Sequence, residues 1–298
     1  MIKPQKALHL YLELDKKRTK IADDTFAIFE KYDGWYGMKD ISQSVVNFER
    51  ISSRARRLIP SLVDLSRSIA TFEETKNIDL QGTLIFEILI KNVPVFKDLN
   101  GILNRSKAPC QAQGAYLMVH DLVVSDKSMP FSERYKLTEQ YVSQLDHPSV
   151  RLAPILSIGG HEEVQRVAES IWKRRSANTS DEGAIGKRID APYSEGKRNK
   201  DIIKVKSEVT LDLHVVGMEE GQGKYAGTLG KLLVKNKAGI TNGVSGMTDE
   251  ERDMWWDYPE LIMNKVVEVQ AMQILENGSL REGRMKAVRH DKLLTEID

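Results

Sequence analysis

The sequence has almost no cysteine. Its 298 residues include one, Cys110, so neither an internal disulfide nor a zinc site built from thiolates can form. The six histidines are scattered, and none follows another at the spacing by which a helix presents two metal ligands. A metal ion bound by this chain would therefore need oxygen ligands, which points to Mg²⁺.

Long apolar runs are also absent. No stretch approaches the roughly 20 apolar residues that a membrane-spanning helix needs. The N-terminal 20 residues alternate charged and apolar side chains, unlike a signal peptide. The hydrophobic fraction of 41% and the charged fraction of 29% are typical of soluble globular proteins. We expect a cytoplasmic, monomeric protein with no membrane partner, long enough for one large or two ordinary domains.

The chain lacks an excess of charge of either sign, since its net charge is +1. Overall charge thus gives no indication of nucleic-acid binding, but basic residues gather locally in residues 53–57, 195–206 and 279–292. Such patches can neutralise phosphates even in a balanced chain. For any single patch, scattered solvated charges are the more common explanation.

Residues before about 207 are expected to contain both strands and helices. Apolar runs predict buried strands within 77–91, 116–124 and 151–158. Helices are predicted over 5–20, over 131–145 with Ser132 as N-cap, and over 161–175 with an apolar face.

The pattern changes after Lys206. Short strands are predicted at 211–216, 224–234 and 265–275, with glycine-rich turns between them. This arrangement suggests a small barrel such as an OB fold. We therefore predict an α+β protein with a domain boundary near Ser207 to Val209, giving domains at 1–207 and 208–298.

The first chemical motif is Lys31-Tyr32-Asp33-Gly34. A lysine can attack phosphorus only as the neutral amine, and because the reference pKa is about 10.4 the site must assist its deprotonation. Nearby cations or a bound metal would do so by penalising the ammonium form. Gly34 would permit a tight turn that exposes the lysine. Taken alone, so short a motif is more often a surface turn.

Four more elements follow in order: Ser53-Arg54, Glu87 within an apolar strand, Asp181-Glu182-Gly183-Ala184-Ile185-Gly186-Lys187, and Ile202-Ile203-Lys204-Val205-Lys206. In a strand, Lys204 and Lys206 share one face while Ile203 and Val205 face the core. Two adjacent ammonium groups favour a bound anion, although a solvated outer strand face explains them equally well.

This ordered set resembles the covalent nucleotidyltransferase superfamily of DNA ligases, RNA ligases and mRNA-capping enzymes. Residues 53–62 are similar to small phage DNA ligases. Three C-terminal stretches are similar to DNA ligases: Val244-Ser245-Gly246-Met247-Thr248-Asp249-Glu250-Glu251-Arg252, Gly278-Ser279-Leu280-Arg281 and Val288-Arg289-His290-Asp291-Lys292. The resemblance covers Phe29 to Lys292. It implies a nucleotidyltransferase domain, with ATP-grasp-like antiparallel sheets and helices, followed by an OB-fold barrel.

The resemblance also implies a reaction. In the family, the motif lysine, here Lys31, attacks the α-phosphate of ATP, and the AMP then passes to the 5′-phosphate of a nick in double-stranded DNA. Lys204 and Lys206 match the pair that contacts the α-phosphate and complete the implied catalytic set. The implied cofactors are ATP and Mg²⁺.

Further positions match family contacts with ATP and the metal. Arg54 and Glu87 fall where members contact the ribose. Glu182 falls at the carboxylate that supports the metal, with Glu87 as a second expected ligand. Arg289, with Asp291, falls in the motif that orients pyrophosphate.

The sequence departs from the family pattern in three places, one of which is Ile85-Phe86 before Glu87, where members have Asp-Gly. Tyr36 stands where many ligases have an arginine, so the phosphate contacts of that arginine must come from elsewhere, with Arg56 or Arg57 as candidates. His120 takes the place of an aromatic residue that stacks on adenine. Lys197 and Arg198 complete the predicted DNA contacts.

Two alternatives remain open. One is an RNA ligase or a capping-type guanylyltransferase of the same superfamily. The other is an OB-fold nucleic-acid-binding protein without catalytic activity.

Overall fold

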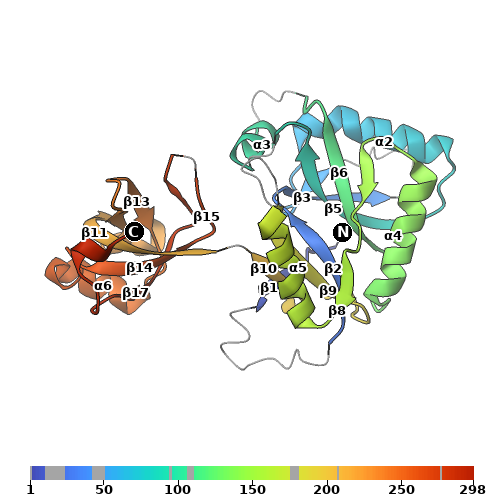
Figure 1. Cartoon of the computed structure of the whole chain (residues 1–298). Helices are drawn as coiled ribbons and strands as arrows, with labels where there is room; N and C mark the ends of the chain where they lie inside the picture. The colour runs from blue at the N-terminus through green and yellow to red at the C-terminus, as the bar shows by residue number, and fades with distance from the viewer. Residues whose placement is uncertain are drawn as a thin grey trace. The chain divides into compact units, whose positions relative to one another are not determined.

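The computed structural model describes residues 2–10, 24–41, 51–93, 96–105, 111–174, 181–206, 208–275 and 277–298. The chain divides into two compact units, Met1–Lys206 and Ser207–Asp298 (Figure 1). None of the helices in these ranges is both long and apolar enough to cross a membrane.

Two five-stranded sheets form the first unit. The strands of sheet A lie in the order β1 (Lys6–His9), β10 (Arg198–Lys206), β9 (Asp181–Arg188), β2 (Phe26–Tyr32) and β8 (Ser157–Gly159). The strands of sheet B lie in the order β4 (Ser52–Ser53), β3 (Trp35–Ile41), β5 (Gly82–Ile90), β6 (Ala115–Val123) and β7 (Val150–Leu152). Most neighbouring strands are antiparallel, whereas β1 with β10 and β6 with β7 are parallel.

Helices cover one face of each sheet. Helix α5 (His161–Arg174) packs on sheet A through Val164, Val167, Ala168 and Ile171, which are buried as the amphipathic pattern predicts. Helices α2 (Val63–Thr75), α3 (Phe96–Leu103) and α4 (Phe131–Leu145), together with the short helix η1 (Pro60–Leu62), contribute to one core with sheet B. The other faces of both sheets are left to line the site described below.

Strand β10 shows how alternation sorts side chains between these faces. Ile203 and Val205 are fully buried in the core with α5, as predicted. Lys204 and Lys206 therefore lie together on the opposite face of the sheet. Two neighbouring ammonium groups are placed there by an ordinary strand, with no special loop.

Two β-bulges interrupt this alternation. Between β2 and β9 the register passes from Lys31 opposite Gly183 to Tyr32 opposite Asp181, so Glu182 is the extra residue. Between β5 and β6 it passes from Ile85 opposite Asp121 to Phe86 opposite Val119, so His120 is the extra residue. A bulge lets side chains leave the face that strict alternation would give them.

The second unit is built on one antiparallel sheet. Its strands lie in the order β13 (Thr241–Val244), β12 (Leu229–Lys235), β11 (Val209–Glu220), β14 (Val266–Ala271) and β17 (Arg284–Val288). A parallel bridge between Ser245 and Arg284, supported by the bond from Met285 N to Ser245 O (2.7 Å), joins the two edges. The sheet therefore curls toward a barrel around one apolar core.

Smaller elements complete the second unit. Strands β15 (Gln273–Ile274) and β16 (Leu280–Arg281) form a separate pair, and η2 (Gly223–Tyr225), η3 (Pro259–Leu261) and η4 (Leu294–Glu296) are short helices. Helix α6 (Asp249–Asp257) begins with a capping box between Thr248 and Glu251, which satisfies otherwise free backbone donors.

Some predicted elements are wrong. Residues 6–9 form strand β1 rather than part of a helix, and 11–20 lie outside the described residues. The N-cap of α4 is Pro130, not Ser132. The strand predicted over 151–158 is two short strands, β7 and β8, because the chain leaves sheet B and joins sheet A between them. The strand predicted from Lys224 begins at Leu229, after η2.

A buried ion pair ties sheet B to α2 and α4. Lys39 is 2% exposed, and its Nζ donates to both carboxylate oxygens of Glu73 at 2.8 and 2.7 Å. The hydroxyl of Tyr141 also donates to Glu73 Oε1, at 2.6 Å. Removing the negative charge would leave the lysine ammonium buried without compensation.

We therefore expect Glu73→Gln to destabilise the protein by about 3 kcal/mol, the usual effect of breaking one side of a buried pair. The neighbouring exposed residue provides the matched control, Glu74→Gln, which should change the free energy of unfolding by less than about 0.5 kcal/mol. Urea denaturation of both variants checks this. Equal midpoints for the two variants would show that the pair does not stabilise the fold.

Candidate active site

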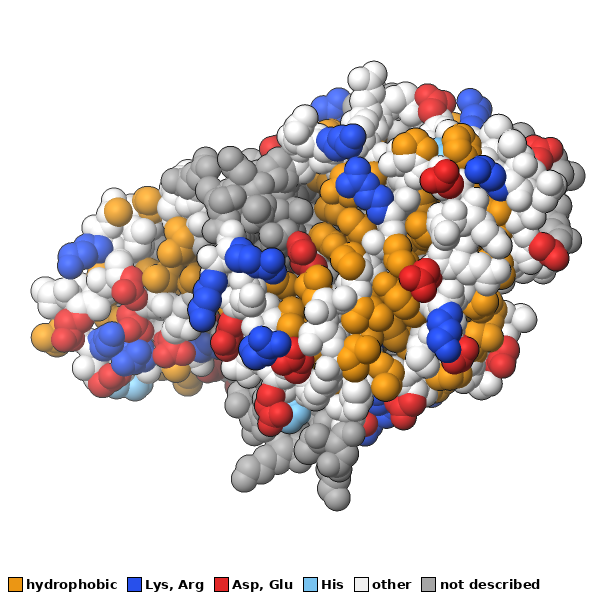
Figure 2. Space-filling model, turned by 45° about the vertical axis from the view of Figure 1, so that its right-hand side comes forward, with side chains coloured by type: hydrophobic (Ala, Val, Ile, Leu, Met, Phe, Trp, Pro, Cys, Tyr) orange, Lys and Arg blue, Asp and Glu red, His pale blue; other side chains and the backbone are white. Residues whose placement is uncertain are grey.

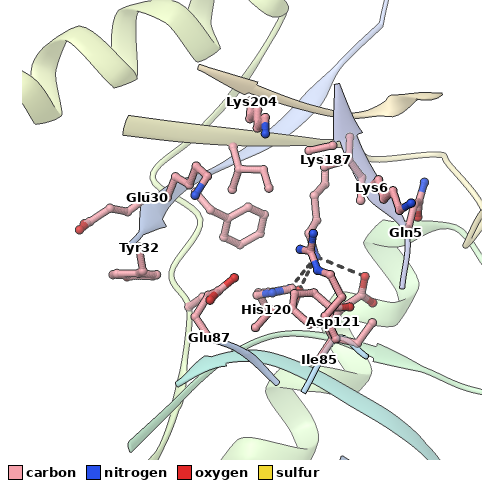
Figure 3. A pocket seen from close by; sticks show the side chains of 18 of the residues that line it. Gln5, Lys6, Glu30, Tyr32, Ile85, Glu87, His120, Asp121, Lys187 and Lys204 are labelled. Carbon is pink, nitrogen blue, oxygen red and sulfur yellow. Dashed lines mark hydrogen bonds and ion pairs between the residues drawn. The ribbon is translucent and has the colours of Figure 1, made fainter. Parts of the chain in front are cut away.

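A cavity of about 250 Å³ lies in the first unit and is lined by residues from both sheets. In Figure 3, Lys204 of sheet A faces Glu87 and His120 of sheet B across this space. Its charged lining residues are the cations Lys6, Lys31, Arg54, Lys187, Arg198, Lys204 and Lys206 and the acids Glu30, Glu87 and Asp121. This excess of cations makes the cavity suited to an anion.

Lys31 lies near the end of β2, just before the turn into β3, as the motif predicts. The reason for Gly34 differs from the expected one. A Cβ at position 34 would come within 2.8 Å of Ile88 O and 3.2 Å of Glu87 Cβ. Close approach of the turn to β5 therefore requires this glycine, which lets Lys31 and Glu87 share one site.

Glu182 connects the lysines. Its side chain is 5% exposed, it pairs with Lys31 Nζ through one oxygen, and its other oxygen lies 3.6 Å from Lys206 Nζ. Burial alone would raise the pKa of Glu182, but the nearby ammonium groups lower it to about 2. Glu182 is therefore a carboxylate throughout the neutral range and neutralises part of the charge around it.

The bulge at Glu182 depends on its neighbours. Gly183 has a φ of +145°, and a Cβ there would lie 2.2 Å from Val205 O, so only glycine fits. The indole of Trp172 on α5 donates to Glu182 O at 3.2 Å. These contacts hold the backbone so that the Glu182 side chain reaches Lys31 instead of the core with α5.

The surroundings of Lys204 lower its pKa. Burial, followed by the charges of Lys206, Lys31 and Arg198, lowers the pKa of Lys204 to about 8. A phosphate placed beside this group would relieve the repulsion. Lys204 and Lys206 line the cavity and are partly buried, which differs from the solvated outer strand face that the sequence left as an equal alternative.

Glu87 is one of two acids that line the cavity from sheet B. Burial raises its pKa to about 7, with Glu182 and Asp33 adding to the rise and Lys31 and Arg54 opposing it. In the described residues no group of three or more Asp, Glu, His or Cys side chains is placed to hold a metal. Glu87 lines the cavity and Glu182 pairs with two of its lysines, so these are the carboxylates that could contribute to a Mg²⁺ site, since Mg²⁺ commonly takes one or two carboxylates and completes its shell with substrate phosphates and water.

One wall of the cavity is formed by Arg54, Tyr36 and His120. The Arg54 guanidinium lies 4.5 Å from the centroid of the Tyr36 ring, and the Tyr36 and His120 rings are 6.5 Å apart. Burial, and then Lys187, lower the pKa of His120 well below its usual value, so the imidazole is neutral at physiological pH.

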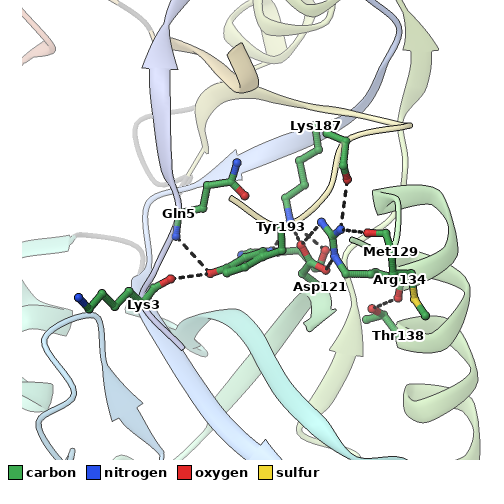
Figure 4. A network of polar contacts seen from close by, with 10 residues as sticks. Lys3, Gln5, Asp121, Met129, Arg134, Thr138, Lys187 and Tyr193 are labelled. Carbon is green, nitrogen blue, oxygen red and sulfur yellow. Dashed lines mark hydrogen bonds and ion pairs between the residues drawn. The ribbon is translucent and has the colours of Figure 1, made fainter. Parts of the chain in front are cut away.

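A buried polar network joins Lys187, Asp121 and Arg134 (Figure 4), and His120 contacts it through Lys187. Lys187 Nζ donates to His120 Nδ1 at 2.8 Å and lies 3.3 Å from Asp121 Oδ2, while Arg134 Nε donates to Asp121 Oδ1 at 2.9 Å. Burial lowers the pKa of Lys187 to about 8, although Asp121 opposes the change. The network fixes the tautomer and orientation of the imidazole.

The predicted site residues do not all lie in this cavity. Those that line it are Lys31, Arg54, Glu87, His120, Arg198, Lys204 and Lys206, and Glu182 contacts two of them. Arg56, Arg57 and Lys197 are absent from its lining, and Arg57 and Lys197 are exposed. Figure 2 shows that one face of the molecule carries mixed charges around hydrophobic side chains.

Arg289 belongs to the second unit, where carboxylates surround it. Its Nη1 donates to the two oxygens of Asp212 at 3.0 and 3.2 Å, and its Nε and Nη2 donate to Asp291 at 2.9 and 2.7 Å. These bonds raise the pKa of Arg289 and lower that of Asp291 to about 2. A phosphate contact of Arg289 would have to compete with these carboxylates.

Lys187, Tyr36 and Asp121 line the cavity although the sequence alone does not indicate a role for them. Lys187 is the last residue of the Glu-Gly-x-x-x-Lys element, so its position in that motif is the available signal. Tyr36 differs from the family arginine at its position, which gives no indication of its own role. Asp121 enters the cavity with its neighbour His120 because of the bulge, which no periodicity reveals.

Known proteins similar to this chain are DNA ligases. A DNA ligase of Thermococcus fumicolans is 30% identical over 195 residues, covering 57% of this chain and 34% of that protein. One of Methanocorpusculum labreanum is 28% identical over 218 residues, covering 70% of this chain and 37% of that protein. The chain thus spans about a third of the length of these curated relatives.

A solved structure extends the likeness to both units. The structure from a study of Lig E DNA ligases has a TM-score of 0.72 and 19% identity, covering 97% of this chain and 100% of that one. The predicted α+β fold, a nucleotidyltransferase domain followed by an OB-fold domain, is confirmed. The family model "ATP dependent DNA ligase domain" matches residues 7–206. This chain therefore belongs to the ATP-dependent DNA ligase family.

Proposed function

We propose that this chain is an ATP-dependent DNA ligase that seals nicks between a 5′-phosphate and a 3′-hydroxyl in duplex DNA. The observation that carries the proposal is the position of Lys31: its ammonium borders a cationic cavity, pairs with the buried Glu182, and shares that carboxylate with Lys206. Membership of the ligase family supports the same reaction.

In the proposed first step, the neutral amine of Lys31 attacks the α-phosphorus of ATP. A P–N bond forms, the bond to the bridging oxygen breaks, and pyrophosphate leaves. Since attack requires the neutral amine, the Lys31 ammonium must give up a proton to solvent and exchange its pairing with Glu182 for contact with the nucleotide. Lys204 and Lys206 stabilise the charge that develops on the phosphoryl oxygens.

In the later steps, the AMP passes to the 5′-phosphate of the nick, and attack by the 3′-hydroxyl then releases AMP. We assign nucleotide contacts to Arg54 and Glu87 at the ribose and to His120 at the adenine. The imidazole of His120 is suited to stack on the adenine ring because it is neutral and is held in place by Lys187. Glu182 and Glu87 would hold Mg²⁺, which would neutralise phosphate charge.

The two units have proposed roles as domains. Residues 1–207 act as the adenylyltransferase domain and 208–298 as the OB-fold domain, which supplies Arg289 for pyrophosphate. We propose that the OB domain moves between the adenylylation and DNA steps.

We assign the contacts with DNA phosphates to four basic residues, Arg56, Arg57, Lys197 and Arg198. We propose that the enzyme acts as a monomer in the cytoplasm, which a chain with a single cysteine suits.

Nick sealing tests the proposed reaction. The protein should join a nicked DNA duplex with ATP and Mg²⁺, and Lys31→Ala and Lys31→Arg should both abolish joining, since neither side chain forms the adenylate. Lys76→Ala, at an exposed lysine with no proposed role, is the matched control and should seal like wild type. Gel electrophoresis of labelled duplexes measures the product. Normal sealing by Lys31→Ala would refute the proposal, and a preference for nicked RNA or for GTP would favour an RNA ligase or a capping enzyme.

The lowered pKa of Lys204 should make the affinity for ATP depend on pH. With a pKa of about 8, this side chain is a cation below that pH and neutral above it. ATP affinity without Mg²⁺ should therefore fall as pH rises from about 7 to about 9, by roughly tenfold if one charged contact is lost. Lys204→Arg, which stays charged, should flatten the profile. Calorimetry at several pH values measures it; parallel profiles for both proteins would rule out titration of Lys204.

The salt dependence of DNA affinity tests the proposed phosphate contacts. If Arg57 and Lys197 each contact a DNA phosphate, Arg57→Ala and Lys197→Ala should each reduce the slope of log affinity against log salt by about one. Exposed Lys76→Ala, on the loop after α2, provides the control. Fluorescence anisotropy with nicked duplex at several salt concentrations measures the slopes. Slopes equal to that of wild type would remove these residues from the DNA interface.

A further inference from the structure

Tyr36 lies on β3 beneath the guanidinium of Arg54. The guanidinium carbon is 4.5 Å from the ring centroid, within the range of a cation–π contact. Arg54 is otherwise an exposed side chain, yet both residues line the cavity. A long exposed arginine has many rotamers, so an aromatic surface that favours one of them reduces the entropy lost when a ligand binds.

The ring of Tyr36 is itself held in place. It packs against a buried cluster that includes Met38, Ile85 and Tyr193, and the ring of His120 lies 6.5 Å away. Burial, and then Tyr193, raise the pKa of Tyr36 well above its usual value. The hydroxyl stays protonated at working pH, and Arg54 therefore meets a neutral aromatic face with no phenolate charge.

The position of the pair decides what it can do. Tyr36 is opposite Glu87 in the β3–β5 ladder, so Arg54 is held on the same wall as the Glu87 carboxylate. Arginine at position 36 would set two guanidinium groups against each other, whereas tyrosine attracts Arg54. The aromatic residue thus replaces repulsion by a contact that directs Arg54 toward the cavity.

We propose that Tyr36 is a positioning residue that holds the Arg54 guanidinium at the nucleotide. This inference rests on the proposed function, because it assumes that ATP occupies the cavity. Tyr36 acts through Arg54 and touches no reacting atom. Loss of its ring should therefore weaken ATP binding and leave the rate at saturating ATP almost unchanged.

The test measures formation of the protein–AMP adduct at several ATP concentrations. Tyr36→Leu and Tyr36→Met, which lack the ring, should raise the half-saturating ATP concentration roughly fivefold. Their maximal rates should remain within about twofold of wild type. Tyr36→Phe keeps the ring face and should behave like wild type.

A double-mutant cycle separates positioning from packing. Arg54→Ala should raise the half-saturating ATP concentration at least as much as Tyr36→Leu. The double variant Tyr36→Leu/Arg54→Ala should be no worse than Arg54→Ala alone, because the ring acts only through the guanidinium. Fully additive effects would overturn the inference.

A matched control comes from the same unit. The guanidinium carbon of Arg151 lies 4.3 Å from the ring centroid of Tyr116, and neither residue lines the cavity. Tyr116→Leu removes an equivalent cation–π contact and should leave ATP dependence unchanged. Thermal unfolding of each variant shows whether it is folded, and Tyr36→Met keeps the test available if Tyr36→Leu does not fold.

Two failures are distinguishable. If wild type forms no adduct with ATP, the proposed function fails. If wild type forms it and the folded Tyr36→Leu and Tyr36→Met variants keep its ATP dependence, the positioning role alone is wrong. A lowered maximal rate with unchanged half-saturation would contradict it equally.

Discussion

The carboxylate of Glu182 lies between two ammonium groups, Lys31 Nζ and Lys206 Nζ, in a largely buried position. Three charges can be buried together only because they are of both signs and in contact. Without Glu182, Lys31, Lys204 and Lys206 would repel one another, and the strands that carry them would lose a favourable contact. With it, the cavity remains cationic overall and the proposed nucleophile is oriented for an incoming phosphate.

Much of this arrangement could be predicted from the sequence, for physical reasons. Strand alternation separates Lys204 and Lys206 from the buried Ile203 and Val205, and the structure agrees. The order of the motifs was enough to predict the family. Periodicity could not predict the bulge that turns Glu182 toward Lys31, because a bulge depends on pairing between strands distant in sequence.

Other features depended on tertiary contacts in the same way. The need for Gly34 arises from β5 passing close to the turn, which no local pattern reveals. Residues 6–9 pair with β10 as a strand although their spacing suggested a helix, so sheet pairing overrides local preference. The second unit shows the same principle, since its Arg289, just after β17, is held by Asp212 of β11.

The proposed reaction bonds AMP to the side-chain amine of Lys31. Peptide mapping by mass spectrometry after incubation with ATP and Mg²⁺ tests it most directly, because it locates the new bond. We expect one AMP per chain, on the peptide that contains Lys31. An adduct on Lys187, Lys204 or Lys206 instead, or none on any peptide, would contradict it.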